Sequence, residues 1–251
     1  MPNAIQTPNA AKEVPAFTVC VLLYGDYPEL AVRCLSKLSL LWKSGTIALR
    51  IGTNAISQRT ADAVEQLGLD DCVFCRSREN IKKYPMMQRL FHSPDPTPGA
   101  GFGMATPLAM WFDDDSYISA EDPHEWLARV KHEMESADMI GSVYSLRLQG
   151  QQAAWVAQQP WYAGLPVPRA HRATYCTGGW WTIRTEVLRK FQWPVPELVH
   201  RGGDVMLGEL CRQQQLRIAR FREGVAINAD ANGHESKSPR RGYDSAPIGF
   251  A

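Results

Sequence analysis

The sequence lacks any run of about 20 apolar residues, the length that a helix needs to cross a membrane. Its first residues, MPNAIQTPNAAKEVPA, also lack the charged and apolar regions of a secretory signal peptide. We therefore expect a protein with no membrane partner that lies in the cytoplasm.

An excess of charge of either sign is also missing. The 27 Lys and Arg residues are nearly balanced by 26 Asp and Glu residues, which leaves a formal net charge of +1. Such a chain has no global field that gathers polyanions, so a nucleic-acid partner requires a local basic patch.

Cysteines are few and lack the dense, regular spacing of a disulfide scaffold, so free thiols are expected. Cys72 and Cys75 form a single CxxC, whereas a structural zinc site normally needs a second pair of ligands, which is not visible. Buried strand cysteines are the favoured interpretation. The six cysteines are Cys20, Cys34, Cys72, Cys75, Cys176 and Cys211.

The chain is long enough, at 251 residues, for a substantial core, and its eight Trp argue against a disordered protein. Residues 1–15 are polar and aperiodic and are expected to form a flexible tail. Residues 16–251 are expected to form a single domain that ends in a basic loop.

Strand and helix patterns alternate in the first half of that domain. A continuous apolar run at 17–24 predicts a strand buried on both faces, the segments at 47–54 and 72–76 predict two further strands, and helices are predicted at 28–42, from apolar residues at helical spacing, and at 58–69. Alternation with short connections predicts an α/β fold with a mostly parallel central sheet and helices on both faces.

The second half is less regular. Residues 105–112 are interpreted as the start of a helix running into a strand, and 139–148 as another strand. An irregular insertion is expected at 149–173, a glycine turn at Gly178 and Gly179 before a strand and a helix, and a similar turn and helix at 202–216. Further strand candidates are 217–221 and 224–230.

Three consecutive aspartates, Asp113 to Asp115, follow the strand predicted before them. Ligands of open α/β sheets bind beyond the carboxyl ends of strands. Adjacent carboxylates repel one another unless they are solvated or share a cation, and Mg²⁺ or Mn²⁺ combines one or two carboxylates with diphosphate oxygens. The alternative is an acidic turn before the next helix, which Ser119 or Asp122 could cap.

Two later segments carry further candidates. Gly202 and Gly203 place Asp204 at a helix start, where its carboxylate could act as a general base or as a simple N-cap. His234 lies in a polar loop that continues to Lys237 and Arg241. Its imidazole could complete a cation shell while the basic residues cover a diphosphate, or the segment could be a solvated tail.

In this order, and over about residues 17–241, these segments resemble the GT-A class of glycosyltransferases. The resemblance implies a Rossmann-like nucleotide-sugar domain in which Asp113 and Asp115 form the metal-binding DxD motif and Asp114 lies near the donor sugar. It also implies that Asp204 is the catalytic carboxylate of an inverting enzyme and that His234 is a late metal ligand.

Residues expected around the nucleotide follow the first three strands. Members of this class more often have an acidic residue at the position of Asn54, which departs from their pattern for recognising the base. Tyr24 could equally be an aromatic residue of the core. The expected nucleotide-binding residues are Tyr24, Asp26, Asn54, Arg78 and Lys83, with Lys237 and Arg241 at the diphosphate.

The segments RENIKKYPMMQRLFH, TGGWWTIR and GGDVMLGELCRQQ are similar to the phage TET-associated glycosyltransferases. This likeness implies a UDP-sugar donor, an acceptor hydroxyl on 5-hydroxymethylcytosine in DNA, and the host cytoplasm as location. Gly178, Gly179, Trp180 and Trp181 would then bind the acceptor, with one indole stacked on an extruded base. Core packing of both indoles is the equal alternative.

Basic residues near the third strand could hold a phosphate backbone, or they could form an ordinary solvated helix face. They are Arg76, Arg78, Lys82, Lys83 and Arg89.

The function predicted from these features is transfer of a hexose from a UDP-sugar to a hydroxyl, with Mn²⁺ or Mg²⁺ and inversion at the anomeric carbon. A nucleotidyltransferase is the first alternative, although YGDYPEL after the first strand contains a single Gly and no glycine-rich phosphate loop. A noncatalytic sugar-binding or nucleic-acid-binding module is the second alternative.

Overall fold

The computed structural model describes residues 15–94, 103–147, 154, 172–196, 198–199 and 202–235. Residues 1–14 of the predicted tail, nearly all of the predicted insertion, Lys237 and Arg241 lie outside this set. In the part of the chain that is described, no helix combines the length and the apolar character needed to cross a bilayer.

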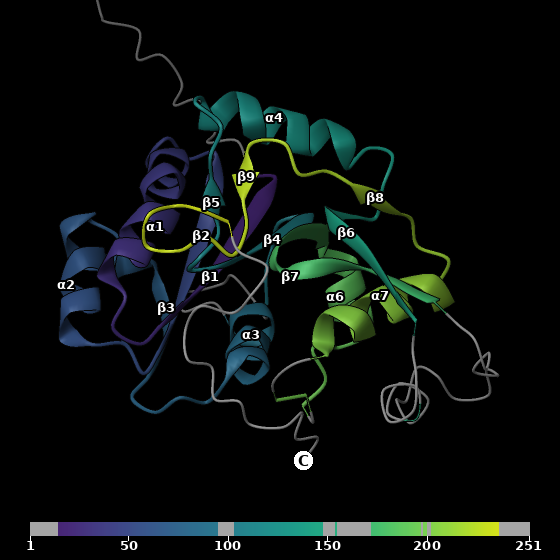
Figure 1. The fold of residues 1–251 in the computed structure, drawn as a ribbon, viewed down its shortest axis with the longest axis horizontal. Coiled ribbons are helices and arrows are strands. Elements are labelled where there is room, and N and C mark those ends of the chain that lie inside the picture. Colours follow the sequence, from purple (N-terminus) through teal and green to yellow (C-terminus); the bar gives the residue numbers. More distant parts are fainter. Residues whose placement is uncertain are drawn as a thin grey trace, which may run out of the picture.

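A seven-stranded sheet in the order β3-β2-β1-β4-β7-β6-β8 forms the centre of the fold (Figure 1). Only β7 runs against the other six strands. This confirms the expected α/β class with a mostly parallel sheet. The strands are β1 (Phe17–Tyr24), β2 (Ile47–Asn54), β3 (Val73–Ser77), β4 (Leu108–Asp113), β6 (Met139–Arg147), β7 (Arg172–Arg184) and β8 (Ile218–Arg220).

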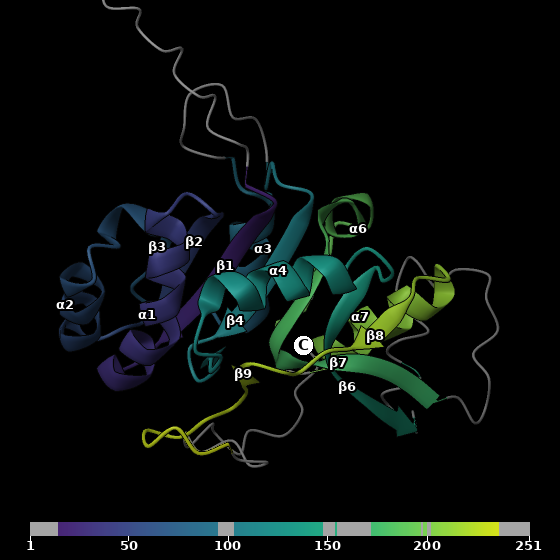
Figure 2. The ribbon, with the colours of Figure 1, turned by 90° about the horizontal axis from the view of Figure 1, so that it is seen from above.

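Helices cover both faces of the sheet, as Figure 2 shows from above. Two separate apolar cores result, one between the sheet and the first group of helices and one between the sheet and the second. The first group is α1 (Pro28–Lys43), α2 (Gln58–Gln66) and α4 (Pro123–Glu133), and the second is α3 (Lys83–His92), α6 (Thr185–Lys190) and α7 (Gly203–Gln213).

Local sequence explains these elements. Seven of the eight residues of β1 are buried, because helices cover both faces of this central strand. Helix α1 begins with Pro28, whose missing N–H costs nothing in the first turn. Asp122 caps α4 by accepting hydrogen bonds from the N–H groups of His124 and Glu125, as one alternative for this region predicted.

Three expectations about the second half are wrong. The described residues just before β4, 103–107, form no helix, and the strand begins at Leu108. Gly178 and Gly179 lie inside the 13-residue strand β7, between Trp180, which pairs with β4, and Cys176, which pairs with β6, and they form no turn. The predicted strand 224–230 shortens to β9 (Val225–Ala226), which pairs with β5 (Tyr117–Ile118) in a separate small sheet.

Candidate active site

The three consecutive aspartates leave β4 with their groups directed to different partners. Asp113 accepts hydrogen bonds from Lys83 Nζ at 2.8 Å and from Trp111 Nε1 at 2.9 Å. The buried Asp114 accepts one from the backbone N–H of Tyr24 at 3.1 Å. The backbone carbonyl of Asp115 accepts from Ala229 N–H at 2.7 Å. The run is therefore three differently placed groups and not one shared acidic patch.

Lys83, the first residue of α3, joins this edge of β4 to β7. Its ammonium donates to Asp113 Oδ2 and to the carbonyl oxygen of Gly178, each at 2.8 Å. Burial lowers the pKa of Lys83, but the carboxylates of Asp113 and Asp204 outweigh this effect and raise it overall. The site thus contains a permanent internal cation.

Asp204 is the second residue of α7 and is not its N-cap, a position that Gly202 occupies. Its Oδ1 accepts a 2.9 Å hydrogen bond from the hydroxyl of Tyr84. Burial raises the pKa of Asp204, while Lys83 and the Tyr84 hydroxyl act in the opposite direction. A partly buried carboxylate with a raised pKa beside a fixed cation is suited to accept a proton.

Two glycines allow these side chains to converge. A Cβ on Gly178 would lie 2.7 Å from both Lys83 Nζ and Asp204 Oδ1. A Cβ on Gly203 would lie 2.2 Å from the ring of Tyr84. Because real Cβ atoms do not approach other atoms so closely, a side chain at Gly178 would displace Lys83 and Asp204, and one at Gly203 would displace the ring of Tyr84.

Asn54 has a different role from the expected nucleotide contact. It is only 2% exposed, and its Oδ1 accepts from Ile81 N–H at 2.9 Å. Its Nδ2 donates to Asn80 Oδ1 at 3.0 Å and to the Lys82 carbonyl at 3.3 Å. Lys82 adopts a left-handed backbone with φ of 73°. Asn54 therefore holds the turn that delivers Lys83 into the site.

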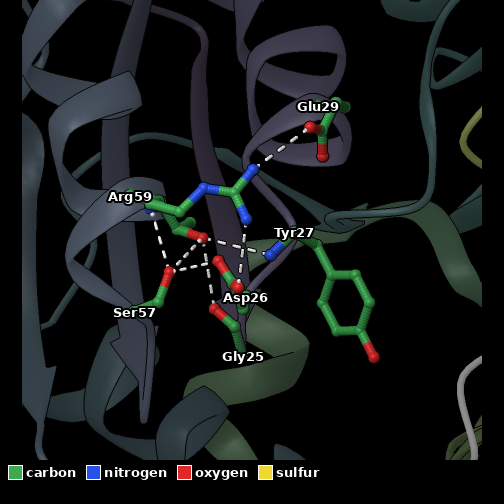
Figure 3. Close-up of polar contacts among 7 residues, drawn as sticks. Gly25, Asp26, Tyr27, Glu29, Ser57 and Arg59 are labelled. Carbon is green, nitrogen blue, oxygen red and sulfur yellow. Dashed lines mark hydrogen bonds and ion pairs between the residues drawn. The ribbon is translucent and has the colours of Figure 1, made fainter.

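Asp26 binds neighbouring protein groups at the same edge of the sheet (Figure 3). Its carboxylate accepts from Ser57 Oγ at 2.5 Å and from Arg59 at 3.3 Å, and Arg59 also pairs with Glu29 at 3.7 Å. In Figure 3 the ring of Tyr27 points away from this network. The network fixes the β1–α1 loop against the start of α2.

The other expected nucleotide residues lie along the same edge. Tyr24 ends β1 and is partly exposed, and Arg78 follows β3 and is exposed. Of the five basic residues expected to hold phosphates, two are in ion pairs: Arg76 with Asp70 at 2.9 Å and Lys83 with Asp113. The five residues therefore do not act as one free basic face.

Stacking of a tryptophan on the acceptor is ruled out by burial. Trp180 is 0% and Trp181 is 1% exposed, and the two indoles lie in the two opposite cores of the sheet. Gly179 packs tightly as well, because a Cβ there would lie 2.5 Å from Ile227 and 2.8 Å from Ser116 Oγ. Core packing is the correct alternative for both indoles.

The expected three-ligand cation site is not preformed. No group of three or more His, Cys, Asp or Glu side chains within the described residues is arranged to hold a metal. Both oxygens of Asp113 accept hydrogen bonds, and the side chain of His234 is 78% exposed and 3.8 Å from Asp230. A cation at this edge of the sheet would therefore need phosphate oxygens of a bound substrate to complete its shell, a common arrangement for Mg²⁺.

The loop that carries His234 nevertheless lies at this edge of the sheet. Arg33 of α1 donates to the carbonyls of Asp230 and Ala231, and Tyr117 donates to the carbonyl of Gly233. In Figure 1 the yellow segment after β9 passes across α1.

Sequence reasoning missed Tyr84, since nothing in KKYPMM marks a tyrosine that reaches a carboxylate 120 positions away.

Neither a protein-family model nor any curated protein matches the sequence. The structure resembles mannosyltransferase PcManGT from Pyrobaculum calidifontis, solved with GDP-Man and Mn²⁺, with a TM-score of 0.52 and 13% identity over 92% of this chain and 59% of that one. S. aureus TarS residues 1–349 match with a TM-score of 0.48 and 13% identity over 82% of this chain and 58% of that one.

The chain thus spans less than two thirds of the length of these structures. At 13% identity the likeness to the mannosyltransferase concerns the fold and no particular activity. The chain has the mixed α/β fold of GT-A glycosyltransferases, as the sequence suggested.

Proposed function

We propose that the protein is a metal-dependent glycosyltransferase that moves a hexose from a UDP-sugar to an acceptor hydroxyl with inversion. The observation that carries this proposal is the position of Asp204, a partly buried carboxylate that lies with Lys83 against Gly178, where Lys83 also binds Asp113. A base on one side and a group of aspartates on the other are what transfer between a donor and an acceptor needs.

Asp204 is the proposed general base. The acceptor oxygen attacks the anomeric carbon from the face opposite the diphosphate, and its proton passes to the Asp204 carboxylate. The bond from the anomeric carbon to the diphosphate oxygen breaks, and the electron pair leaves with the nucleoside diphosphate. The raised pKa of Asp204, caused by burial, makes this carboxylate a stronger base than one in water.

On the donor side, Asp115 is the proposed cation ligand, together with the donor diphosphate. A bound Mn²⁺ or Mg²⁺ supplies positive charge for the leaving diphosphate. Asp113, neutralised by Lys83, and the buried Asp114 shape the floor of the donor site. His234 is left as a ligand that would have to rotate inward, and Lys237 and Arg241 remain proposed diphosphate contacts.

The proposed acceptor is 5-hydroxymethylcytosine in DNA, whose primary hydroxyl is a suitable nucleophile. Support comes from the segments around Lys83, Gly178 and Asp204 that resemble DNA-modifying enzymes of phages. These same three segments converge on the base.

The test is to incubate the protein and Mn²⁺ with UDP-sugars or GDP-mannose and DNA that contains either 5-hydroxymethylcytosine or cytosine. Nucleoside masses should show a hexose on the modified base alone, with release of a free nucleoside diphosphate. Release of pyrophosphate would instead indicate nucleotidyl transfer. Absence of hexose on any nucleoside would refute the acceptor.

Asp204→Asn tests the base while keeping the shape of the side chain. Transfer should fall at least about 100-fold, a usual loss for a missing general base, while donor binding measured by calorimetry persists. Asp71→Asn, at an exposed position after α2, is the matched control and should transfer normally. Full activity of Asp204→Asn would remove the proposed base.

A further inference from the structure

The strands β6 and β7 continue beyond the end of β4 as a two-stranded ribbon. The last pair between β4 and β7 joins Phe112 to Trp180, whereas β6 and β7 go on pairing from Val143 opposite Cys176 to Arg147 opposite Arg172. β8 pairs with β6 only as far as Gly141. Figure 2 shows both strands reaching away from the body of the sheet.

Two tyrosines lie directly opposite each other on this ribbon. Tyr144 pairs with Tyr175 in the strand register, and their ring centroids are 6.4 Å apart with the planes tilted by 31°. Tyr144 is 49% exposed, one of four large hydrophobic side chains that are exposed among the described residues. An exposed aromatic pair offers flat faces on which the planar rings of a ligand can stack.

Helix α7, which carries the proposed base Asp204, packs against the β7 strand of the ribbon. Gly208 lies one helical turn after Asp204 and so on the same side of α7. A Cβ on Gly208 would lie 2.2 Å from the Thr174 carbonyl oxygen and 2.5 Å from Tyr175 Cβ. β7 therefore passes Asp204 at Gly178 and Gly208 at Tyr175. Three residues of extended strand span about 10 Å, so Tyr175 lies roughly that far along β7 from the point where the strand passes Asp204.

The charges of the ribbon are all positive. Neither β6 nor β7 contains Asp or Glu, and Arg147 and Arg172 occupy opposite positions at the far end. Arg172 donates to Ser145 Oγ at 3.1 Å, and Arg220 of β8 donates to the Val143 carbonyl at 2.9 Å. Aromatic faces beside arginines favour a ligand that has both planar rings and phosphates, rather than a neutral saccharide.

We infer that Tyr144 and Tyr175 form an acceptor platform on which the bases of a single nucleic-acid strand stack, with Arg172 near its phosphates. This inference rests on the proposed function, because it assigns the acceptor side of the site built around Asp204. It also supplies the aromatic contact that the buried Trp180 and Trp181 do not make.

The test measures the binding of a fluorescein-labelled, single-stranded oligonucleotide by anisotropy, without a donor. Tyr144→Ala should weaken binding at least about fivefold, the lower end for loss of one stacked base, whereas Tyr144→Phe should bind as the wild type does. Leu40→Ala, which shortens another exposed hydrophobic side chain on α1, is the control for general surface effects. Arg172→Ala should also reduce the salt dependence of binding.

Equal affinities of wild type and Tyr144→Ala would overturn the platform. So would binding of a neutral oligosaccharide in preference to the oligonucleotide. If the wild type transfers hexose but binds no oligonucleotide, the platform is wrong and the transferase proposal stands. If it binds the oligonucleotide through Tyr144 but transfers no hexose, the platform stands and the proposed reaction is wrong.

Discussion

Tyr84→Phe removes one hydroxyl from the centre of the site. That hydroxyl donates a 2.9 Å hydrogen bond to Asp204, and the buried ring packs edge-on against Trp193 with centroids 5.9 Å apart. Phenylalanine keeps the ring in place, so the substitution isolates the hydrogen bond. A hydrogen bond to a charged group contributes roughly 1.5 to 3 kcal/mol, which corresponds to about one to two pKa units.

The expected result is a higher pKa of Asp204 and hence a shift in the pH dependence of transfer. Burial already raises this pKa, and the Tyr84 hydroxyl opposes the rise. Since the base must be deprotonated, the acid limb of kcat/KM should move about one to two pH units upward in Tyr84→Phe. Activity should recover at high pH, because the base itself is still present.

The raised pKa of Asp204 also makes the free energy of unfolding depend on pH. The folded state binds the Asp204 proton more tightly than the unfolded state, so this group lowers the free energy of unfolding as pH rises through the folded pKa. Without this hydrogen bond, Tyr84→Phe should lose roughly 1.5 to 3 kcal/mol in urea unfolding at a pH above the folded pKa of Asp204, and less below that pKa, where the carboxyl is protonated.

The matched control is Tyr117→Phe, which loses a longer 3.4 Å hydrogen bond to the uncharged Gly233 carbonyl. Its pH profile should be that of the wild type. An unchanged acid limb in a folded Tyr84→Phe protein would refute the reasoning, because Tyr84 would then have no influence on the ionisation of Asp204.

Two further substitutions test how the site is assembled. Gly178→Ala places a methyl group 2.7 Å from Lys83 Nζ and from Asp204 Oδ1, so both groups must move. Transfer should fall about 100-fold with little change in Tm. Wild-type kinetics would show that the close approach of Lys83 and Asp204 to Gly178 is not required. Asn54→Ala removes the hydrogen bonds that hold residues 80–82. Tm should fall, since two or three hydrogen bonds contribute about 2 to 3 kcal/mol, and kcat should fall because Lys83 loses its position. A normal kcat despite a lower Tm would limit Asn54 to a structural role.

The fold could be predicted in large part because its signals are local. The run FTVCVLLY and the spacing of apolar residues in α1 identify a strand and a helix without knowledge of the rest of the chain. The Gly178-Gly179 pair misled for the same reason, since glycines favour turns locally. The strand residues that flank the two glycines decide the conformation instead, because Trp180 pairs with β4 and Cys176 pairs with β6.

The site was less predictable because its contacts join distant segments. The sequence places Asp113 to Asp115 after a strand. It does not reveal that Lys83 forms an ion pair with Asp113, or that the backbone N–H of Tyr24 donates to Asp114. The position of Asn54 at the end of β2 predicts a contact with the nucleotide, but its side-chain amide forms hydrogen bonds with residues of the 80–82 turn instead. Strand ends locate the edge of the sheet, while side-chain partners depend on the packing across it.

The contacts that build the site also bear on how the protein acquires activity during folding. Lys83 meets Asp113 and Gly178, which lie 30 and 95 positions further along the chain, and Tyr84 meets Asp204 across 120 positions. Contacts of such large sequence separation require closure of long loops and form slowly. A nascent chain therefore cannot hold a working base until α7 has been synthesised and docked. No fragment ending before α7 should transfer sugar.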